Sequence, residues 1–130
     1  MSFLGGIFAY KRAETLEKID SLGILLEQKD NGTEIKIKPG DEVRLKLQIV
    51  GGTGYNWYFD DAVFEYFDLM GETTEPQAGE ETGKVGGPVL RLWTLKSKKG
   101  GQCAIKTDYF RVWEGRTRAI KHFEVRVFIE

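Results

Sequence analysis

The residue types that most often carry out catalysis are scarce in this sequence. It contains one histidine, His122, and one cysteine, Cys103. On a strand, His122 would have the opposite parity to Phe123 and Val125, so we expect it to face outward without a catalytic role. Cys103 shares parity with Ile105 and is predicted to be a small core side chain rather than a reactive thiol. A nucleophile paired with a base is therefore not predicted.

Neither a metal site nor a phosphate site is indicated by the spacing of the other polar residues. Residues 58–83 contain many acidic side chains and no basic one, but they lack the compact, alternating Asp/Asn loop that binds calcium. Residues 83–87 are rich in glycine, yet no Lys-Ser/Thr pair follows them, as it would in a phosphate-binding loop. We therefore expect no cofactor, no metal ion and no enzymatic activity. Unrecognised carboxylate chemistry is kept as a weaker alternative.

Alternation of apolar and polar residues predicts that most of the chain forms strands. Residues 43–49 place Val, Leu, Leu and Ile on one face and Arg, Lys and Gln on the other, which is the pattern of a strand with one buried side. Similar patterns run through 35–37, 103–109 and 123–129, and Asp30-Asn31-Gly32 has the composition of a hairpin turn. About eight short strands separated by turns predict an all-β fold, an immunoglobulin-like antiparallel β-sandwich.

The remaining segments define the domain organisation. Residues 1–23 are expected to be an N-terminal extension, with a helix over 12–22, and residues 24–130 to be a single sandwich domain. The aromatic-rich stretch 64–69 is predicted to be a strand. Residues 71–87 contain several glycines and a proline and are predicted to be a long exposed loop.

Composition limits the classes of partner. The net charge is -1 and the basic residues are spread over several predicted strands and turns, so we expect no nucleic-acid partner. The apolar runs are too short to cross a bilayer, and we expect no membrane partner. No signal peptide is evident, and a single cysteine fits a reducing compartment, which favours the cytoplasm over a secreted or lysosomal location. We also expect a monomer.

Three connections rich in glycine or tryptophan are the best candidates for binding. They are residues 51–55 (the first loop), 83–88 (the second loop) and 111–115 (the third loop). In a sandwich, these connections can end on the same edge and form one surface. Thr53 is the side chain expected at the tip of the first loop, and Trp113 is expected to be an exposed interface anchor. Trp57 is expected to lie in the core.

At these three loops the chain resembles the chagasin family, the protein inhibitors of papain-like cysteine peptidases. The family's first loop reads Asn-Pro-Thr-Thr-Gly-Tyr/Phe followed closely by Trp, and this chain has Val50-Gly51-Gly52-Thr53-Gly54-Tyr55-Asn56-Trp57. Its second loop reads Gly-X-Gly-Gly, and here Lys84-Val85-Gly86-Gly87 stands in place. Its third reads Arg-Pro-Trp, often with Tyr two residues earlier, and here Tyr109-Phe110-Arg111-Val112-Trp113 corresponds. The resemblance covers about residues 24–130.

The resemblance implies a reversible, non-covalent inhibitor whose partner is a papain-like cysteine peptidase, cathepsin L-like or similar. The first loop would enter the peptidase cleft with Thr53 and Gly54 foremost. The other two loops would flank it, with Trp113 packed against an aromatic residue of the enzyme. The peptidase-binding residues implied in this way are Gly51, Gly52, Thr53, Gly54, Tyr55, Val85, Gly86, Gly87, Arg111, Val112 and Trp113.

Departures from the family pattern lead to a further expectation. Val50-Gly51-Gly52 replaces Asn-Pro-Thr, Lys84 replaces a glycine and Val112 replaces a proline. Glycine in place of proline makes a free loop floppier, so we expect weaker or slower binding, or a shifted peptidase preference. Restoring Pro and Thr at 51 and 52 is expected to slow dissociation. The alternative function is an immunoglobulin-like adhesion or assembly module that binds a partner other than a peptidase.

Overall fold

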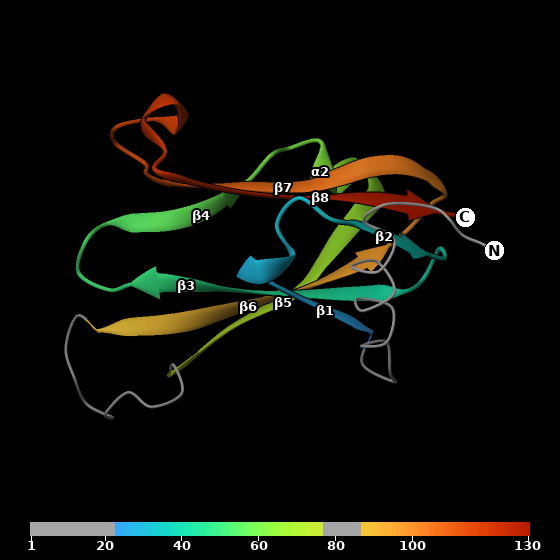
Figure 1. Cartoon of the computed structure of the whole chain (residues 1–130), viewed down its shortest axis with the longest axis horizontal. Coiled ribbons are helices and arrows are strands. Elements are labelled where there is room, and N and C mark those ends of the chain that lie inside the picture. Colours follow the sequence, from blue (N-terminus) through green and yellow to red (C-terminus); the bar gives the residue numbers. More distant parts are fainter. Residues whose placement is uncertain (1–22, 77–86) are drawn as a thin grey trace.

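The computed structural model describes residues 23–76 and 87–130, and it places their strands in two facing sheets (Figure 1). Sheet A has the strand order β1-β3-β6-β5, and sheet B has the order β2-β8-β7-β4. The eight strands are β1 Ile24–Glu27, β2 Glu34–Ile37, β3 Glu42–Val50, β4 Tyr55–Phe59, β5 Phe67–Pro76, β6 Pro88–Ser97, β7 Gly101–Arg111 and β8 Lys121–Ile129. The short helical turns are η1 Gln28–Asp30, α2 Val63–Tyr66 and η2 Arg116–Arg118. None of these helical segments is both long enough and apolar enough to cross a membrane.

The core lies between the sheets and is built by the predicted alternation. In β3, buried and half-buried residues alternate along the whole strand, and the antiparallel register sets Val43 opposite Leu95 and Leu45 opposite Trp93. Apolar side chains of one parity therefore face the other sheet and leave water together, which is the main source of the fold's stability. The immunoglobulin-like β-sandwich predicted from the sequence is confirmed.

The prediction of purely antiparallel sheets was wrong at two edges. Strand β1 runs parallel to β3, and β2 runs parallel to β8, so both sheets are mixed. The turn at residues 30–32 was predicted to close a hairpin, but it carries the chain from sheet A to sheet B. Asp30 is buried at this crossover, where its carboxylate accepts a hydrogen bond from the Glu27 N–H at 2.9 Å. The turn residues were recognised correctly, but turn chemistry alone does not determine which strands pair.

The stretch after β4 also differs from the prediction. Residues 64–69 were expected to be one strand, but the chain forms α2 and then β5. The first six residues of the predicted loop 71–87 belong to β5, which pairs with β6 as far as Pro76 despite a register shift between Leu69 and Gly71. Most of β5 is exposed, so it lacks the buried alternate face by which strands are recognised in a sequence. Residues 77–86 of that loop, and the predicted helix over 12–22 with nearly all of the N-terminal extension, lie outside the described residues.

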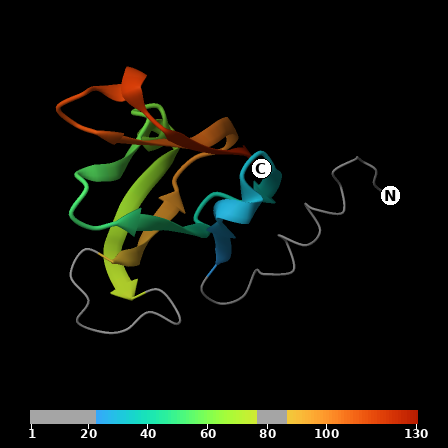
Figure 2. The same cartoon turned by 60° about the vertical axis from the view of Figure 1, so that its left-hand side comes forward.

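The β3–β4 and β7–β8 connections lie at the same end of the sandwich, as the views in Figures 1 and 2 agree. Residues 51–54 join β3 to β4, and residues 112–120 join β7 to β8. The first and third predicted loops are thus brought together because β4, which follows the first loop, and β7, which precedes the third, are hydrogen-bonded neighbours in sheet B.

Candidate functional site

The first loop is a compact bend held by its own polar groups. Gly52 and Gly54 have φ values of 79° and 84°, in the left-handed region that favours glycine. Between them, the Thr53 hydroxyl donates to the Val50 carbonyl at 2.8 Å and accepts from the Tyr55 N–H at 3.3 Å. The hydroxyl is therefore turned into the loop, and the exposed positions at the tip are the two glycines. Thr53 lies in the bend, where it was expected, but its hydroxyl is used within the loop.

Arg111, at the end of β7, holds the first loop from the strand that neighbours β4 in sheet B. Its Nε donates to the Thr53 carbonyl at 2.8 Å, and its guanidinium lies 4.4 Å from the centroid of the Tyr55 ring. A further ion pair joins Arg111 to Glu114 at 3.5 Å. Arg111 thus links the first and third loops within this chain, and three of its contacts are already made before any partner binds.

Trp113 is the most exposed aromatic anchor in the third loop. It is 69% exposed and its neighbour Val112 is 63% exposed, as expected for Trp113. The indole nevertheless touches the first loop: a Cβ added at Gly54 would lie 3.1 Å from both Cζ2 and Cζ3 and closer still to Cη2. Two features therefore favour glycine at position 54: the left-handed backbone and the room that the indole needs.

Only part of the second loop falls within the described residues. The Gly87 carbonyl accepts a hydrogen bond from the Gly51 N–H at 3.4 Å, so the end of the second loop lies beside the start of the first. Val85 and Gly86 lie outside the described residues, and their place in the site stays a prediction.

A cluster of aromatic rings packs at the base of the first loop. The Tyr109 hydroxyl accepts from the Val50 N–H at 3.1 Å, and its ring stacks on Tyr55 with centroids 5.3 Å apart. Trp57 lies on the other side of Tyr109 at 4.9 Å and donates from Nε1 to the Gln48 carbonyl. Trp57 is 4% exposed, which confirms its predicted place in the core. The contact of Tyr109 with the loop was not predicted, although the tyrosine two residues before Arg111 was the available signal.

These contacts restrain the first loop, which the sequence predicted to be floppy. The loop is tied to Gly87, Arg111 and Tyr109 as well as to its own hydroxyl. Pre-formed loops lose less conformational entropy on binding, by about 1–2 kcal/mol per residue already fixed. The glycines at 51 and 52 were read as a source of flexibility, but Gly52 is required by the bend.

Neither of the two residues first considered for catalysis belongs to the three loops. Cys103 is partly buried against the core, and desolvation by burial raises the pKa of its thiol to about 11, so it is an unreactive thiol at neutral pH. His122 faces outward as predicted, with 70% of its side chain exposed. Its Nδ1, however, donates to Asp108 Oδ1 at 2.7 Å, a contact that strand alternation does not predict.

Comparison with known proteins places these features among peptidase inhibitors. Residues 36–127 match the model of the chagasin family peptidase inhibitor I42. Amoebiasin-2 of Entamoeba histolytica is 29% identical over 109 residues, which cover 84% of this chain and 86% of that protein. The crystal structure of the cysteine protease inhibitor EhICP2 from Entamoeba histolytica matches with a TM-score of 0.68 and 27% identity, covering 82% of this chain and 94% of that one. The solution structure of Amebosin has the same fold, with a TM-score of 0.58 and 20% identity over 82% of this chain and 96% of that one.

Proposed function

The chain belongs to the chagasin family of peptidase inhibitors, and on this basis we propose that it inhibits papain-like cysteine peptidases with the three loops at one end of its sandwich. The observation that carries the proposal is the linkage of the first and third loops. Arg111 holds the Thr53 carbonyl at 2.8 Å, and Trp113 lies against Gly54. The two loops therefore form one continuous edge that is shaped before binding.

The bend of the first loop accounts for inhibition without cleavage. A peptide bond is cleaved when its carbonyl carbon is held close to the nucleophile with one face open to attack. The left-handed glycines at 52 and 54 turn the backbone sharply, so the tip fills a cleft without lying along it as a substrate would. The hydrogen bonds that hold this bend also limit the entropy that binding removes.

The third loop supplies the apolar anchor. Trp113 presents most of its surface to solvent while one edge of the indole is fixed by Gly54. Large, held aromatic side chains at the centre of an interface contribute most to affinity. Trp113 and Val112 therefore contact the enzyme beside its cleft, and we propose that Val85, Gly86 and Gly87 of the second loop contact it as well.

A titration of papain and of a cathepsin L-like peptidase with the full chain tests the proposal. We expect activity to fall to zero near one inhibitor per enzyme and to recover after dilution. Trp113→Ala should weaken binding by about 2 kcal/mol or more, with little change in melting temperature because the side chain is mostly exposed. Full peptidase activity at a molar excess of folded protein would reject the proposal and favour the adhesion or assembly module.

A further inference from the structure

The part of the β7–β8 connection that contains η2 is folded over the outer face of sheet B. Asp108 and Phe110 have the outward parity on β7, yet they are 5% and 6% exposed. Arg116, in η2, covers them: its guanidinium lies 5.1 Å from the centroid of the Phe110 ring, and Nη1 donates to Asp108 Oδ2 at 2.6 Å. Arg116 therefore covers these outer positions together with Tyr58, whose ring centroid lies 4.7 Å from that of Phe110.

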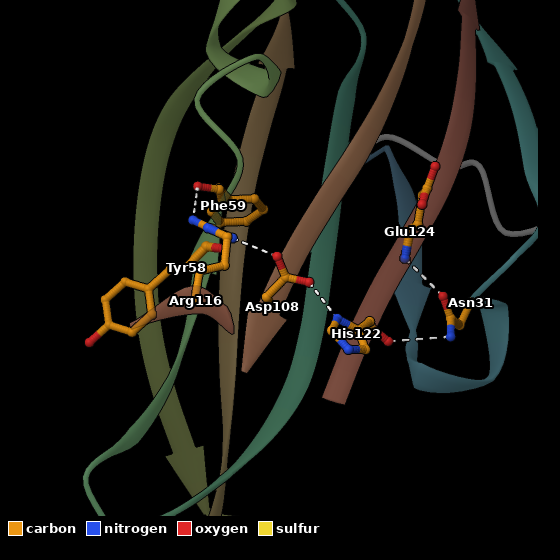
Figure 3. A network of polar contacts seen from close by, with 7 residues as sticks. All are labelled: Asn31, Tyr58, Phe59, Asp108, Arg116, His122 and Glu124. Atoms are coloured by element: carbon orange, nitrogen blue, oxygen red, sulfur yellow. Dashed lines mark hydrogen bonds and ion pairs between the residues drawn. The ribbon is translucent and has the colours of Figure 1, made fainter. Parts of the chain in front are cut away.

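Arg116 also reaches the edge strand of the same sheet. Nη1 and Nη2 donate to the carbonyls of Tyr58 and Phe59, at 3.2 and 3.3 Å. Figure 3 shows the guanidinium between these carbonyls and the Asp108 carboxylate. The planar, forked guanidinium can serve several acceptors at fixed angles, which a lysine cannot do. Arg116 therefore joins η2 to β4 and β7 simultaneously.

The Asp108 carboxylate is held on its other side by β8. His122 lies opposite Asp108 in the β7–β8 register, and its Nδ1 donates to the second carboxylate oxygen. Asn31 fixes β8 at the same point, because its amide donates to the His122 carbonyl and accepts from the Glu124 N–H (Figure 3). Asp108 is thus an immobile acceptor to which Arg116 is attached.

The backbone between this attachment and the tryptophan is itself hydrogen-bonded. Gly115, with a φ of 86°, lies between Trp113 and Arg116; its N–H donates to the Arg111 carbonyl at 3.2 Å and its carbonyl accepts from the Arg118 N–H at 3.1 Å. On the near side, Arg111 ties the start of the connection to the first loop. The position of Trp113 is therefore set from two sides, by Arg111 before it and by Arg116 after it.

We infer that Arg116 and Asp108 are positioning residues of the inhibitory surface: their ion pair fastens the η2 part of the β7–β8 connection to sheet B and thereby holds Trp113 against Gly54. The inference rests on the proposed function. Neither residue needs to contact the peptidase, and the two act through the place that they give to the indole.

Nuclear magnetic resonance of the free protein provides a readout that needs no peptidase. The Gly54 Hα protons lie beside the Trp113 indole and experience its ring current, and Trp113→Ala gives the chemical shift without the ring. We expect Arg116→Gln to move the Gly54 shift toward that of Trp113→Ala. Arg118→Gln, an exposed arginine in the same turn, should leave it unchanged. Asn31→Ala, which loosens the far end of the network, should lower the melting temperature without moving the Gly54 shift.

Dissociation from papain provides the second readout. We expect Arg116→Gln to dissociate roughly tenfold faster, the size of effect expected for a lost charge-assisted contact, with association little changed. Arg116→Lys keeps the charge but not the fork, so it should fall between the wild type and Arg116→Gln in both readouts. It also decides the question if Arg116→Gln does not fold.

The outcomes separate this inference from the proposed function. A folded Arg116→Gln with an unchanged Gly54 shift overturns the inference, and so does a moved shift with unchanged dissociation. A wild-type protein that leaves papain active counts against the proposed function, while the Gly54 shift still decides whether Arg116 positions Trp113.

Discussion

The Trp113 indole occupies the space that a side chain at Gly54 would need: a Cβ at residue 54 would be 3.1 Å from Cζ2 and Cζ3 of the indole and would overlap Cη2. The first loop comes from β3 and β4, and the tryptophan comes from the far end of β7. Because Gly54 has no side chain, the Trp113 indole of the third loop can pack against the first loop. A substitution at either residue should therefore change the conformation of both loops.

Gly54→Ala should weaken inhibition more than backbone strain alone explains. The new methyl group must displace Trp113. Alanine must also adopt a left-handed backbone conformation, which costs about 1–2 kcal/mol. Gly40→Ala is the matched control, because Gly40 has a φ of 93° and open space around it at the opposite end of β3. We expect both variants to lose similar stability in thermal unfolding, and Gly54→Ala alone to raise the inhibition constant for papain. Equal inhibition constants for the two variants would remove the Gly54–Trp113 contact from the binding surface.

Pro and Thr at positions 51 and 52 should now be expected to weaken binding. The tighter binding predicted from the sequence required an unbonded N–H at residue 51, but the Gly51 N–H donates to Gly87. At residue 52 the backbone is the obstacle, because Gly52 has a φ of 79°, where a β-branched threonine is strained. Stopped-flow kinetics with Gly51→Pro and Gly52→Thr as single variants should show faster dissociation for each. Slower dissociation of either variant would show that the free loop differs from the bend described above.

The sequence was informative where one strand's alternation decides the outcome. Residues 43–49 predicted β3, and the shared parity of Trp57 and Phe59 predicted that Trp57 is buried. It was uninformative where residues distant in sequence meet. Asp108 has outward parity, and nothing nearby in sequence indicates that Arg116 turns back across it to the carbonyls of β4. The inward turn of the Thr53 hydroxyl was missed for a related reason, since a threonine between two glycines can face either way until the bend is known.

Cys103 should react slowly with alkylating reagents and contribute nothing to inhibition. Burial raises its pKa to about 11, so little thiolate is present at neutral pH, and the thiolate is the reactive form. Because the raised pKa favours the protonated thiol in the folded state, the stability that it contributes is lost as the pH rises from about 9 toward 11. Iodoacetamide labelling of Cys103, monitored by mass spectrometry, should be slower than that of a free thiol. Cys103→Ala should leave the inhibition constant unchanged. Rapid labelling at pH 7 with loss of inhibition would contradict both expectations.

Asp108 should make the fold sensitive to acid. Burial alone would raise the pKa of its carboxyl, but the hydrogen bonds from His122 and Arg116, with their positive charges, outweigh burial and lower it below the ordinary value. A lowered pKa means that the unfolded state binds the proton more readily. The stability that this carboxylate contributes is therefore complete above about pH 4 and lost as the pH falls through the folded-state pKa.

Asp108→Asn removes this titration, while Asp68→Asn is the matched control at an exposed ion pair with Lys98. We expect the melting temperature of the wild type and of Asp68→Asn to fall more steeply below pH 4 than that of Asp108→Asn, which should be less stable at neutral pH because the Arg116 guanidinium loses its charged partner. The Gly54 Hα shift, followed through the same pH range, should move toward the Trp113→Ala value in the wild type before global unfolding begins. A shift that stays constant until the whole fold melts would show that the carboxylate stabilises the sandwich without controlling the third loop.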